Sequence, residues 1–242
     1  MKRFPSLTKL FILMFPVFFN AISYAAEVEP KWLTKLDYRQ RLIFNQCPSV
    51  FENDGQVEGT KVKRVFDYYA KDANTLHWKK LVEGAHFTAG VRQGKYGNAG
   101  SLEGDLDYVL RHFPNHPQAL FVMGKLQAGD QFNPRKGSRK DYFYWSIDCY
   151  LKRAIEMGNN YPDTYLVAAI LTHRKKEYET AESNYLKSIS LSEESIEAKY
   201  NLGLLYFDMS QYDKAKKYAK EAYQAGYPLQ GLKQKLKSKN NW

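Results

Sequence analysis

A stretch near the end of the chain, residues 200–223, has the sequence YNLGLLYFDMSQYDKAKKYAKEAY. It places Gly203, Ala215 and Ala222 among large aromatic residues, at positions where an ordinary amphipathic helix can hold bulkier side chains. Small residues at such positions let two helices cross closely. Gly203 costs about 1 kcal/mol of helix propensity relative to alanine, so the packing that it permits must offset this cost. The stretch therefore predicts two closely packed antiparallel helices, over 196–209 and 212–224.

The same pattern occurs 34 residues earlier in the chain. Tyr212 follows Tyr178, Ala215 follows Ala181, Ala222 follows Ser188 and Gly203 follows Ala169, each at this one offset. Self-similarity at a fixed period of this length is typical of stacked helical repeats. Each unit is therefore expected to be one pair of helices.

This spacing resembles that of the tetratricopeptide repeat (TPR) family. The last unit matches its motif at Asn201, Leu202, Gly203, Tyr206, Tyr212, Ala215 and Ala222, and the preceding unit at Tyr165, Ala169, Tyr178, Ala181, Tyr185 and Ser188. The preceding unit departs at Thr172, where an aromatic residue is usual. The resemblance implies an all-α fold, a right-handed superhelix of about three to four helix pairs with an irregular N-terminal segment.

The expected organisation has a repeat domain over residues 88–240. Its units are a partial one at 88–116, one at 117–161, and two regular ones at 162–195 and 196–229, closed by a capping helix at 230–238. The second unit is interrupted at 129–140 by GDQFNPRKGSRK, whose glycine, proline and serine content indicates a loop. This loop carries a basic surface of Arg135, Lys136, Arg139 and Lys140. The segment 26–87 shows no repeat, and only a short helix near 32–44 is expected in it.

Residues 1–25 have the pattern of a signal peptide. A basic start precedes the apolar run LFILMFPVFF, and small residues suited to cleavage end at Ala25. The run is shorter than the about 20 apolar residues that a membrane span needs. We expect an exported, periplasmic protein, with an uncleaved membrane anchor as the alternative. Loss of Lys2, Arg3 and Lys9 leaves 33 of the 36 basic residues against 26 acidic ones, a net charge of about +7.

The chain also resembles a group of exported bacterial repeat proteins. The likeness lies in VEGAHFT at 82–88, GDLDYVLRHFPNHPQAL at 104–120 and GYPLQGLKQKL at 226–236. It implies an exported scaffold and no particular substrate.

Only two cysteines are present, Cys47 and Cys149. Cys149 lies two residues after Ile147, one of the inward positions of its helix, so it is expected on the opposite, outward face. An exposed thiol is reactive in an oxidising compartment, where two cysteines have one possible pairing. We expect a disulfide that ties the N-terminal segment across the back of the repeats. The alternative is two separate thiols covered by packing.

The sequence contains no motif that indicates an enzyme. G-x-S-x-G, H-E-x-x-H and C-x-x-C are all missing. Glu83 and His86 have a spacing used in di-iron bundles, but no second copy exists, so a structural role is expected. His112 and His116 lie on either side of Pro114 and do not share a helical face. We expect no catalytic residue, no cofactor, no metal and, because of export, no nucleic-acid partner.

The TPR resemblance implies that the first helices of successive units line a groove that accepts extended peptides or helices. Carried over residue by residue, the groove positions are Phe121, Lys125, Leu166, Ile170, His173, Tyr200, Asn201, Leu204 and Phe207. Several are large and apolar where an exposed helix prefers polar residues. The alternative is that the loop 129–140 or the N-terminal segment covers them.

These observations predict a non-catalytic scaffold that binds another envelope protein or peptide segment. The alternative is direct binding of an anionic glycan or membrane surface through the basic loop and the C-terminal lysines.

Overall fold

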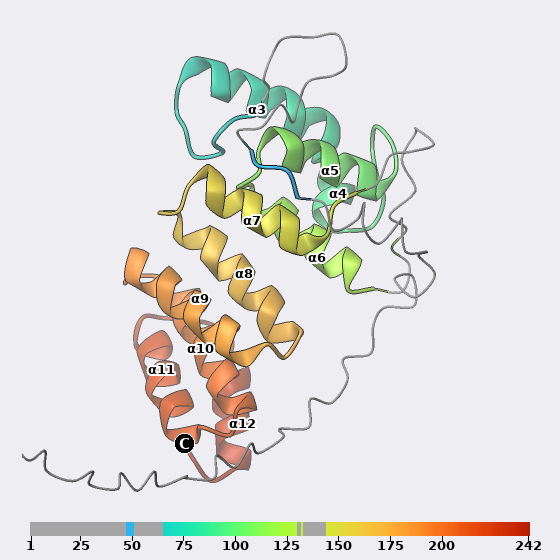
Figure 1. Ribbon diagram of the computed structural model, residues 1–242. Coiled ribbons are helices and arrows are strands. Elements are labelled where there is room, and N and C mark those ends of the chain that lie inside the picture. The colour runs from blue at the N-terminus through green and yellow to red at the C-terminus, as the bar shows by residue number, and fades with distance from the viewer. Residues whose placement is uncertain (1–46, 51–64, 130–131, 133–143) are drawn as a thin grey trace, which may run out of the picture.

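The computed structural model describes residues 47–50, 65–129, 132 and 144–242, and within these ranges every regular element is a helix. This confirms the expected all-α fold. The elements are α3 (Ala73–His86), α4 (Ala89–Arg92), α5 (Leu102–His112), α6 (Pro117–Gln127), α7 (Ile147–Met157), α8 (Pro162–Arg174), α9 (Tyr178–Leu191), α10 (Ile196–Asp208), α11 (Tyr212–Gln224) and α12 (Gly231–Ser238). Figure 1 shows them stacked from α3 and α5 at one end to α11 and α12 at the other.

Three of the sequence-based expectations fall outside the described residues. They are the signal peptide at 1–25, the helix near 32–44 and the basic side chains Arg135, Lys136, Arg139 and Lys140 of the inserted loop.

The last two regular units have the same backbone geometry at the predicted offset. The turn between α8 and α9 has a positive φ of 61° at Lys176, and the turn between α10 and α11 has a positive φ of 60° at Ser210, 34 residues later. Each turn is closed by a hydrogen bond that spans five residues, from Glu177 N to Thr172 O and from Gln211 N to the carbonyl of Tyr206. The 34-residue period is therefore a repeat of structure as well as of side-chain type.

The glycines of the first helices make room for the next first helix in the stack. A Cβ atom added at Gly203 would lie 2.6 Å from Leu232 Cδ2 on α12, and 3.4 Å from the carbonyl oxygen of Ala215 on α11. A Cβ atom added at Gly124 on α6 would lie 2.5 Å from Leu171 Cδ1 on α8. The sequence had indicated Ala215 as the close neighbour of Gly203. The capping helix approaches more closely still.

The first helices form an unbroken row. α4 packs on α6, α6 on α8, α8 on α10 and α10 on α12, whereas among the described residues α7, α9 and α11 make no comparable contacts with one another. A stack whose helices are close on one side and further apart on the other must curve toward the close side. The row of first helices is therefore the inner side of the curve.

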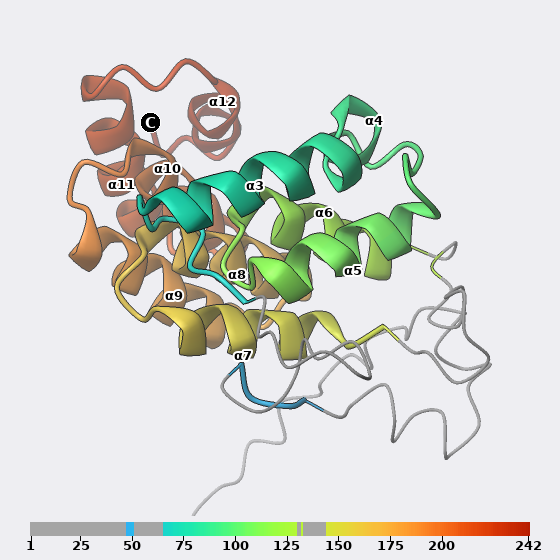
Figure 2. The ribbon, with the colours of Figure 1, turned by 90° about the horizontal axis from the view of Figure 1, so that it is seen from above.

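One helix lies in a segment for which the sequence pattern indicated no regular structure. α3 begins after Asp72, whose side chain accepts a hydrogen bond from Thr75 N at 3.0 Å, and it packs along α5 with α4 following it (Figure 2). Leu76 and Leu81 of this helix are each 49% exposed. Because its large aliphatic residues do not share a buried face, α3 lacks the apolar periodicity by which the other helices are predicted.

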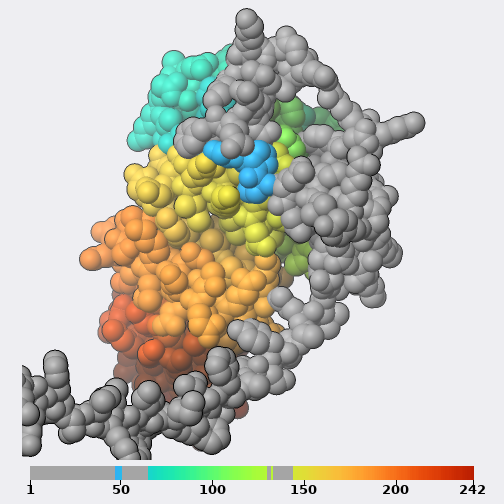
Figure 3. All heavy atoms as spheres, in the orientation of Figure 1, coloured from blue at the N-terminus to red at the C-terminus, as the bar shows by residue number. Residues whose placement is uncertain are grey.

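Residues 47–50 are attached to α7, as Figure 3 shows. Cys47 and Cys149 form a disulfide with a Cα–Cα distance of 5.2 Å, which confirms the expected pairing. Arg153 Nη1 donates to Pro48 O at 2.6 Å, and Glu156 Oε2 accepts from Val50 N at 3.0 Å. The expected outward position of Cys149 needs a correction. The residue is only 3% exposed and belongs to the hydrophobic core, against which Cys47 also packs.

Candidate partner-binding surface

The α6 part of the expected groove is accessible. Phe121 is partly buried against the core, and Lys125 is exposed with its Nζ 5.6 Å from the centre of the Phe121 ring. Gln118, which is also exposed, lies three residues before Phe121 and so shares its helical face. This face presents an aromatic ring between two polar side chains.

On α8 the expected residues differ in accessibility. Leu166 is buried, Ile170 is partly buried, and His173 is partly exposed with its Nε2 3.1 Å from Asp208 Oδ2 on α10. Burial lowers the pKa of His173, and the neighbouring Asp208 carboxylate opposes this shift. Asp208 Oδ1 also lies 3.5 Å from Lys235 Nζ on α12, so polar contacts connect the inner sides of three successive helices.

On α10, Tyr200 is part of the core. Its ring stacks on Tyr227 with centroids 4.1 Å apart, and its hydroxyl accepts a hydrogen bond from Leu232 N. Leu166 and Tyr200 are only 9% and 5% exposed, so neither presents a side chain that a partner can contact. The expectation for these two is corrected: Leu166 and Tyr200 belong to the same buried cluster, and the chain after α11 covers Tyr200.

The other three α10 residues are partly exposed. Asn201 Nδ2 donates to Glu197 O at 2.9 Å, and Leu204 packs against the buried residues shared by α8 to α12. The ring of Phe207 contacts Tyr212 with centroids 5.4 Å apart, and Lys235 Nζ lies 5.1 Å above the same ring. The accessible members of the expected groove are therefore Phe121, Lys125, Ile170, His173, Asn201, Leu204 and Phe207, which we call the inner surface.

The lysines near the C-terminus cover aromatic rings as well as carrying charge. Lys214 Nζ lies 4.8 Å from the ring of Tyr206, and Lys233 Nζ lies 5.1 Å from that of Trp242. Long lysine side chains commonly pack their stems on apolar surface in this way. Part of this basic surface therefore serves packing.

The two histidine-containing patterns noted in the sequence do not meet at a metal site. His86 Nδ1 lies 2.7 Å from Asp105 Oδ1, whereas the Glu83 carboxylate faces another partner, His116 Nε2, at 3.4 Å. Within the described ranges, no group of three or more histidine, cysteine or acidic side chains is placed to hold a metal ion.

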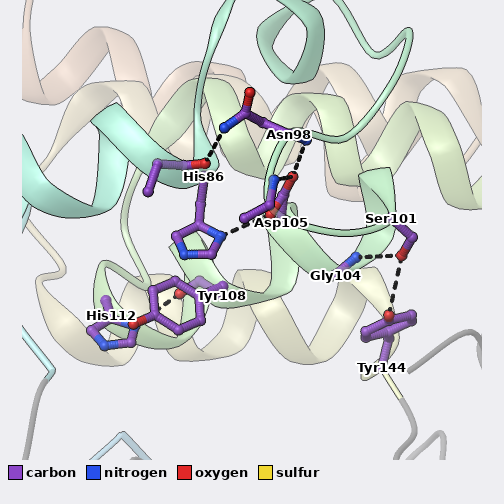
Figure 4. A network of polar contacts seen from close by, with 10 residues as sticks. His86, Asn98, Ser101, Gly104, Asp105, Tyr108, His112 and Tyr144 are labelled. Atoms are coloured by element: carbon purple, nitrogen blue, oxygen red, sulfur yellow. Dashed lines mark hydrogen bonds and ion pairs between the residues drawn. The ribbon is translucent and has the colours of Figure 1, made fainter. Parts of the chain in front are cut away.

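Figure 4 shows what His86 and Asp105 do instead. The Asp105 carboxylate accepts hydrogen bonds from the backbone N–H groups of Asn98 and Ala99 while it contacts His86. Asn98 Nδ2 in turn donates to Ala85 O. This network attaches the connection between α4 and α5 to the end of α3, which is a structural role.

A hollow of about 630 Å³ lies where α3, α4 and α6 meet, and sequence reasoning did not predict it. The side chains that define its chemistry are Lys80, Glu83, Phe87, Arg92, Gln93 and Gln118. Residues 80–93 supply five of them from α3, α4 and the residues next to these helices, and Gln118 comes from α6, so no single motif indicates the set. The sequence signals were the stretch VEGAHFT, which contains Glu83 and Phe87, and the stretch GDLDYVLRHFPNHPQAL, which contains Gln118.

No helix in the described part of the chain is both long and apolar enough to cross a lipid bilayer.

Comparison with known proteins adds little to this geometry. No protein-family model matches the sequence, and no curated protein matches it. Two crystal structures of MamA are similar, each at 18% sequence identity. One has a TM-score of 0.43 and covers 71% of this chain and 86% of its own, and the other has a TM-score of 0.45 and covers 70% and 85%. At this identity and TM-score neither structure supports a conclusion about this protein, so the evidence for the repeat architecture is the helix pairs described above.

Proposed function

We propose that this protein is a non-catalytic scaffold of the cell envelope that binds a segment of another envelope protein along its inner surface. The observation that carries the proposal is the row of first helices, which presents Phe121, Ile170, Leu204 and Phe207 only partly buried. Partly exposed apolar side chains that line one continuous side of a molecule are typical of interaction sites. The arrangement suits an extended peptide or a helix that supplies its own apolar residues.

The disulfide supports an envelope location. Disulfides persist in oxidising compartments and are rare in the cytosol. The bond between Cys47 and Cys149 is therefore consistent with export by the signal peptide expected at 1–25. An exported scaffold of this kind assists the assembly or positioning of another exported protein or complex.

A pair of aspartate substitutions tests the inner surface. Leu204→Asp with Phe207→Asp places two carboxylates on the surface and is expected to abolish capture of the partner in cross-linking and pull-down from the envelope. The matched control is Leu186→Asp with Leu229→Asp, since both leucines are exposed and lie on other parts of the molecule. Circular dichroism and thermal unfolding show whether each variant keeps its helices. Unchanged capture by the folded inner-surface variant would exclude this surface as the binding site.

A second candidate function is direct binding of an anionic glycan or membrane surface. It is favoured by the exposed lysines of α11 and of the end of the chain, of which Lys220, Lys237 and Lys239 form no ion pair among the described residues. The basic loop residues Arg135, Lys136, Arg139 and Lys140 would contribute to the same binding. Retention on an acidic polymer that is lost at about 0.5 M salt would favour this function, because such salt screens exposed charges.

A further inference from the structure

The hollow between α3, α4 and α6 carries an excess of positive charge. Lys80 and Arg92 contribute two cations, and among the described residues neither is within ion-pair distance of an acidic group. Arg92 is oriented by its own backbone contact, because its Nε donates to Phe87 O at 2.8 Å. This leaves the terminal amino groups of the guanidinium without a hydrogen bond to the described protein, and they form the edge that binds a carboxylate in two parallel hydrogen bonds.

The one carboxylate in the hollow already has partners within the protein. Glu83 Oε1 lies 3.4 Å from Nε2 of His116, a side chain that is only 2% exposed. His116 Nδ1 accepts from Ala119 N, so the Nε2 atom carries the proton when the ring is neutral and faces the Glu83 carboxylate. This contact lowers the pKa of Glu83, while burial and Glu83 raise the pKa of Tyr68 to about 12. Glu83 is therefore ionised and directed toward the interior.

Neutral side chains complete the hollow with hydrogen-bonding groups. The amides of Gln93 and Gln118 are exposed at its edge, and each offers both a donor and an acceptor. The hollow is open to solvent, and the volume that it offers is about 630 Å³. It exceeds what one carboxylate needs, so part of a chain can enter with it.

The hollow continues into the inner surface. Gln118 lies on the same face of α6 as Phe121 and Lys125, at spacings of three and seven residues. A chain that leaves the hollow along α6 therefore meets an aromatic ring next, followed by Ile170 and Leu204 on the succeeding helices of the row. A ligand that satisfies both regions needs acidic groups at one end and apolar groups along the rest. A protein segment has this mixed chemistry, whereas an anionic polysaccharide does not supply aliphatic side chains.

We propose that this hollow binds an acidic side chain of the partner segment and so anchors one end of that segment on the inner surface. The proposal deepens the proposed function and rests on it. Lys80 and Arg92 attract and hold the carboxylate, and Gln93 and Gln118 position the backbone beside it. The charge complementarity fixes the direction in which the segment lies, with its acidic end at α3 and its apolar part over α8 and α10.

The test uses the full mature chain and two fluorescein-labelled peptides of equal length, one alternating glutamate with leucine and one alternating glutamine with leucine. Fluorescence anisotropy gives the dissociation constant of each. We expect tighter binding of the glutamate peptide, and a loss of about tenfold or more in Lys80→Glu, since like charges at a binding site are strongly unfavourable. Lys80 makes no described contact that this substitution would break, so the fold is retained. Arg92→Lys keeps the charge but not the two parallel hydrogen bonds, and an intermediate loss is expected.

The matched control is Lys187→Glu, which makes the same charge change on α9, where the lysine is also exposed. Wild-type affinity in this control, together with the loss in Lys80→Glu, supports the hollow as the anchor. Equal binding of the two peptides, or an equal loss in both lysine variants, overturns the proposal, and so does failure of the wild-type protein to bind either peptide.

The variant with Leu204→Asp and Phe207→Asp separates this proposal from the proposed function. If it loses the peptides while Lys80→Glu does not, the anchor is wrong and the inner surface stands. If Lys80→Glu loses the glutamate peptide while the inner-surface variant does not, the hollow binds carboxylates and the wider surface is wrong.

Discussion

Removal of the disulfide should weaken the fold by a few kcal/mol. Cys47 and Cys149 are separated by 102 residues, and a crosslink over about 100 residues removes about 4.7 kcal/mol of unfolded-state entropy in the chain-entropy model. Measured losses on removing a native disulfide are about 2–5 kcal/mol, so we expect Cys47→Ala with Cys149→Ala to fall in this range. Since Cys149 is only 3% exposed, alanine is preferable to serine, which would bury a hydroxyl group.

The assay is chemical denaturation followed by circular dichroism, with and without a reducing agent. The reduced wild-type protein and the double variant should unfold at similar, lower denaturant concentrations, and the reducing agent should not change the variant. Equal unfolding midpoints for oxidised and reduced wild-type protein would refute this reasoning, as would two alkylatable thiols in the non-reduced protein.

A non-covalent control separates the crosslink from the contacts around it. Glu156 accepts hydrogen bonds from the Ser49 hydroxyl and from Val50 N, and the Ser49 contact lowers the pKa of Glu156. Glu156→Gln weakens the attachment of residues 47–50 without opening the disulfide. Its expected cost is about 1 kcal/mol, the usual net value of a hydrogen bond. A loss as large as that of the cysteine variant would mean that docking of residues 47–50, and not chain entropy, is the main contribution.

Four further substitutions test the packing, the turns and a buried titratable group. Gly203→Leu should destabilise the fold by about 1–3 kcal/mol in denaturant titrations, although leucine is the better helix former. The reason is that the Cβ atom of the new side chain alone would lie 2.6 Å from Leu232. Unchanged stability would contradict this packing. Lys176→Gly and Ser210→Gly should each raise the unfolding midpoint, with a net gain of at most about 1 kcal/mol, because glycine adopts the positive φ without strain; a lower midpoint would argue against the left-handed turns. Burial lowers the pKa of His116 from 6.5, so the unfolded chain takes up the proton first and stability falls as the pH drops below 6.5. His116→Gln should flatten that part of the pH profile of thermal unfolding, and an unchanged slope would show that His116 does not cause it.

The regular units could be predicted from sequence because their apolar positions repeat at one offset. The expected second helix of the last unit, 212–224, has the same bounds as α11, and the capping helix expected at 230–238 is α12, Gly231–Ser238. In both, the pattern of buried residues follows the helical period, so local sequence carries the information.

The rest could not be predicted, because it depends on contacts between distant segments. Tyr200 shares a helix with the accessible Leu204, and only the position of Tyr227, set by the chain after α11, shows that it is buried. The hollow likewise needs Lys80, Arg92 and Gln118 from three helices that no repeat pattern relates. A sequence motif identifies each unit of a repeat protein, whereas the binding surface of the whole protein depends on how neighbouring units pack together.

The packing around α8 implies that a destabilising substitution at one end of the molecule leaves the other end folded. Val167, Ala168 and Leu171 belong to the core cluster that includes α5, α6 and α7, whereas Leu166 and Ala169 belong to the cluster of α9 to α12. Each cluster is thus complete on its own side of α8.

Stability in stacked repeats is a sum of units and nearest-neighbour interfaces, so Gly203→Leu should reduce amide protection in α10, α11 and α12 while α5, α6 and α7 keep theirs. The disulfide acts within the first cluster, because Cys149 lies on α7, so it adds nothing to the resistance of the C-terminal helices to local opening. If amide protection in Gly203→Leu is lost evenly along the chain, the two clusters unfold together and α8 couples them.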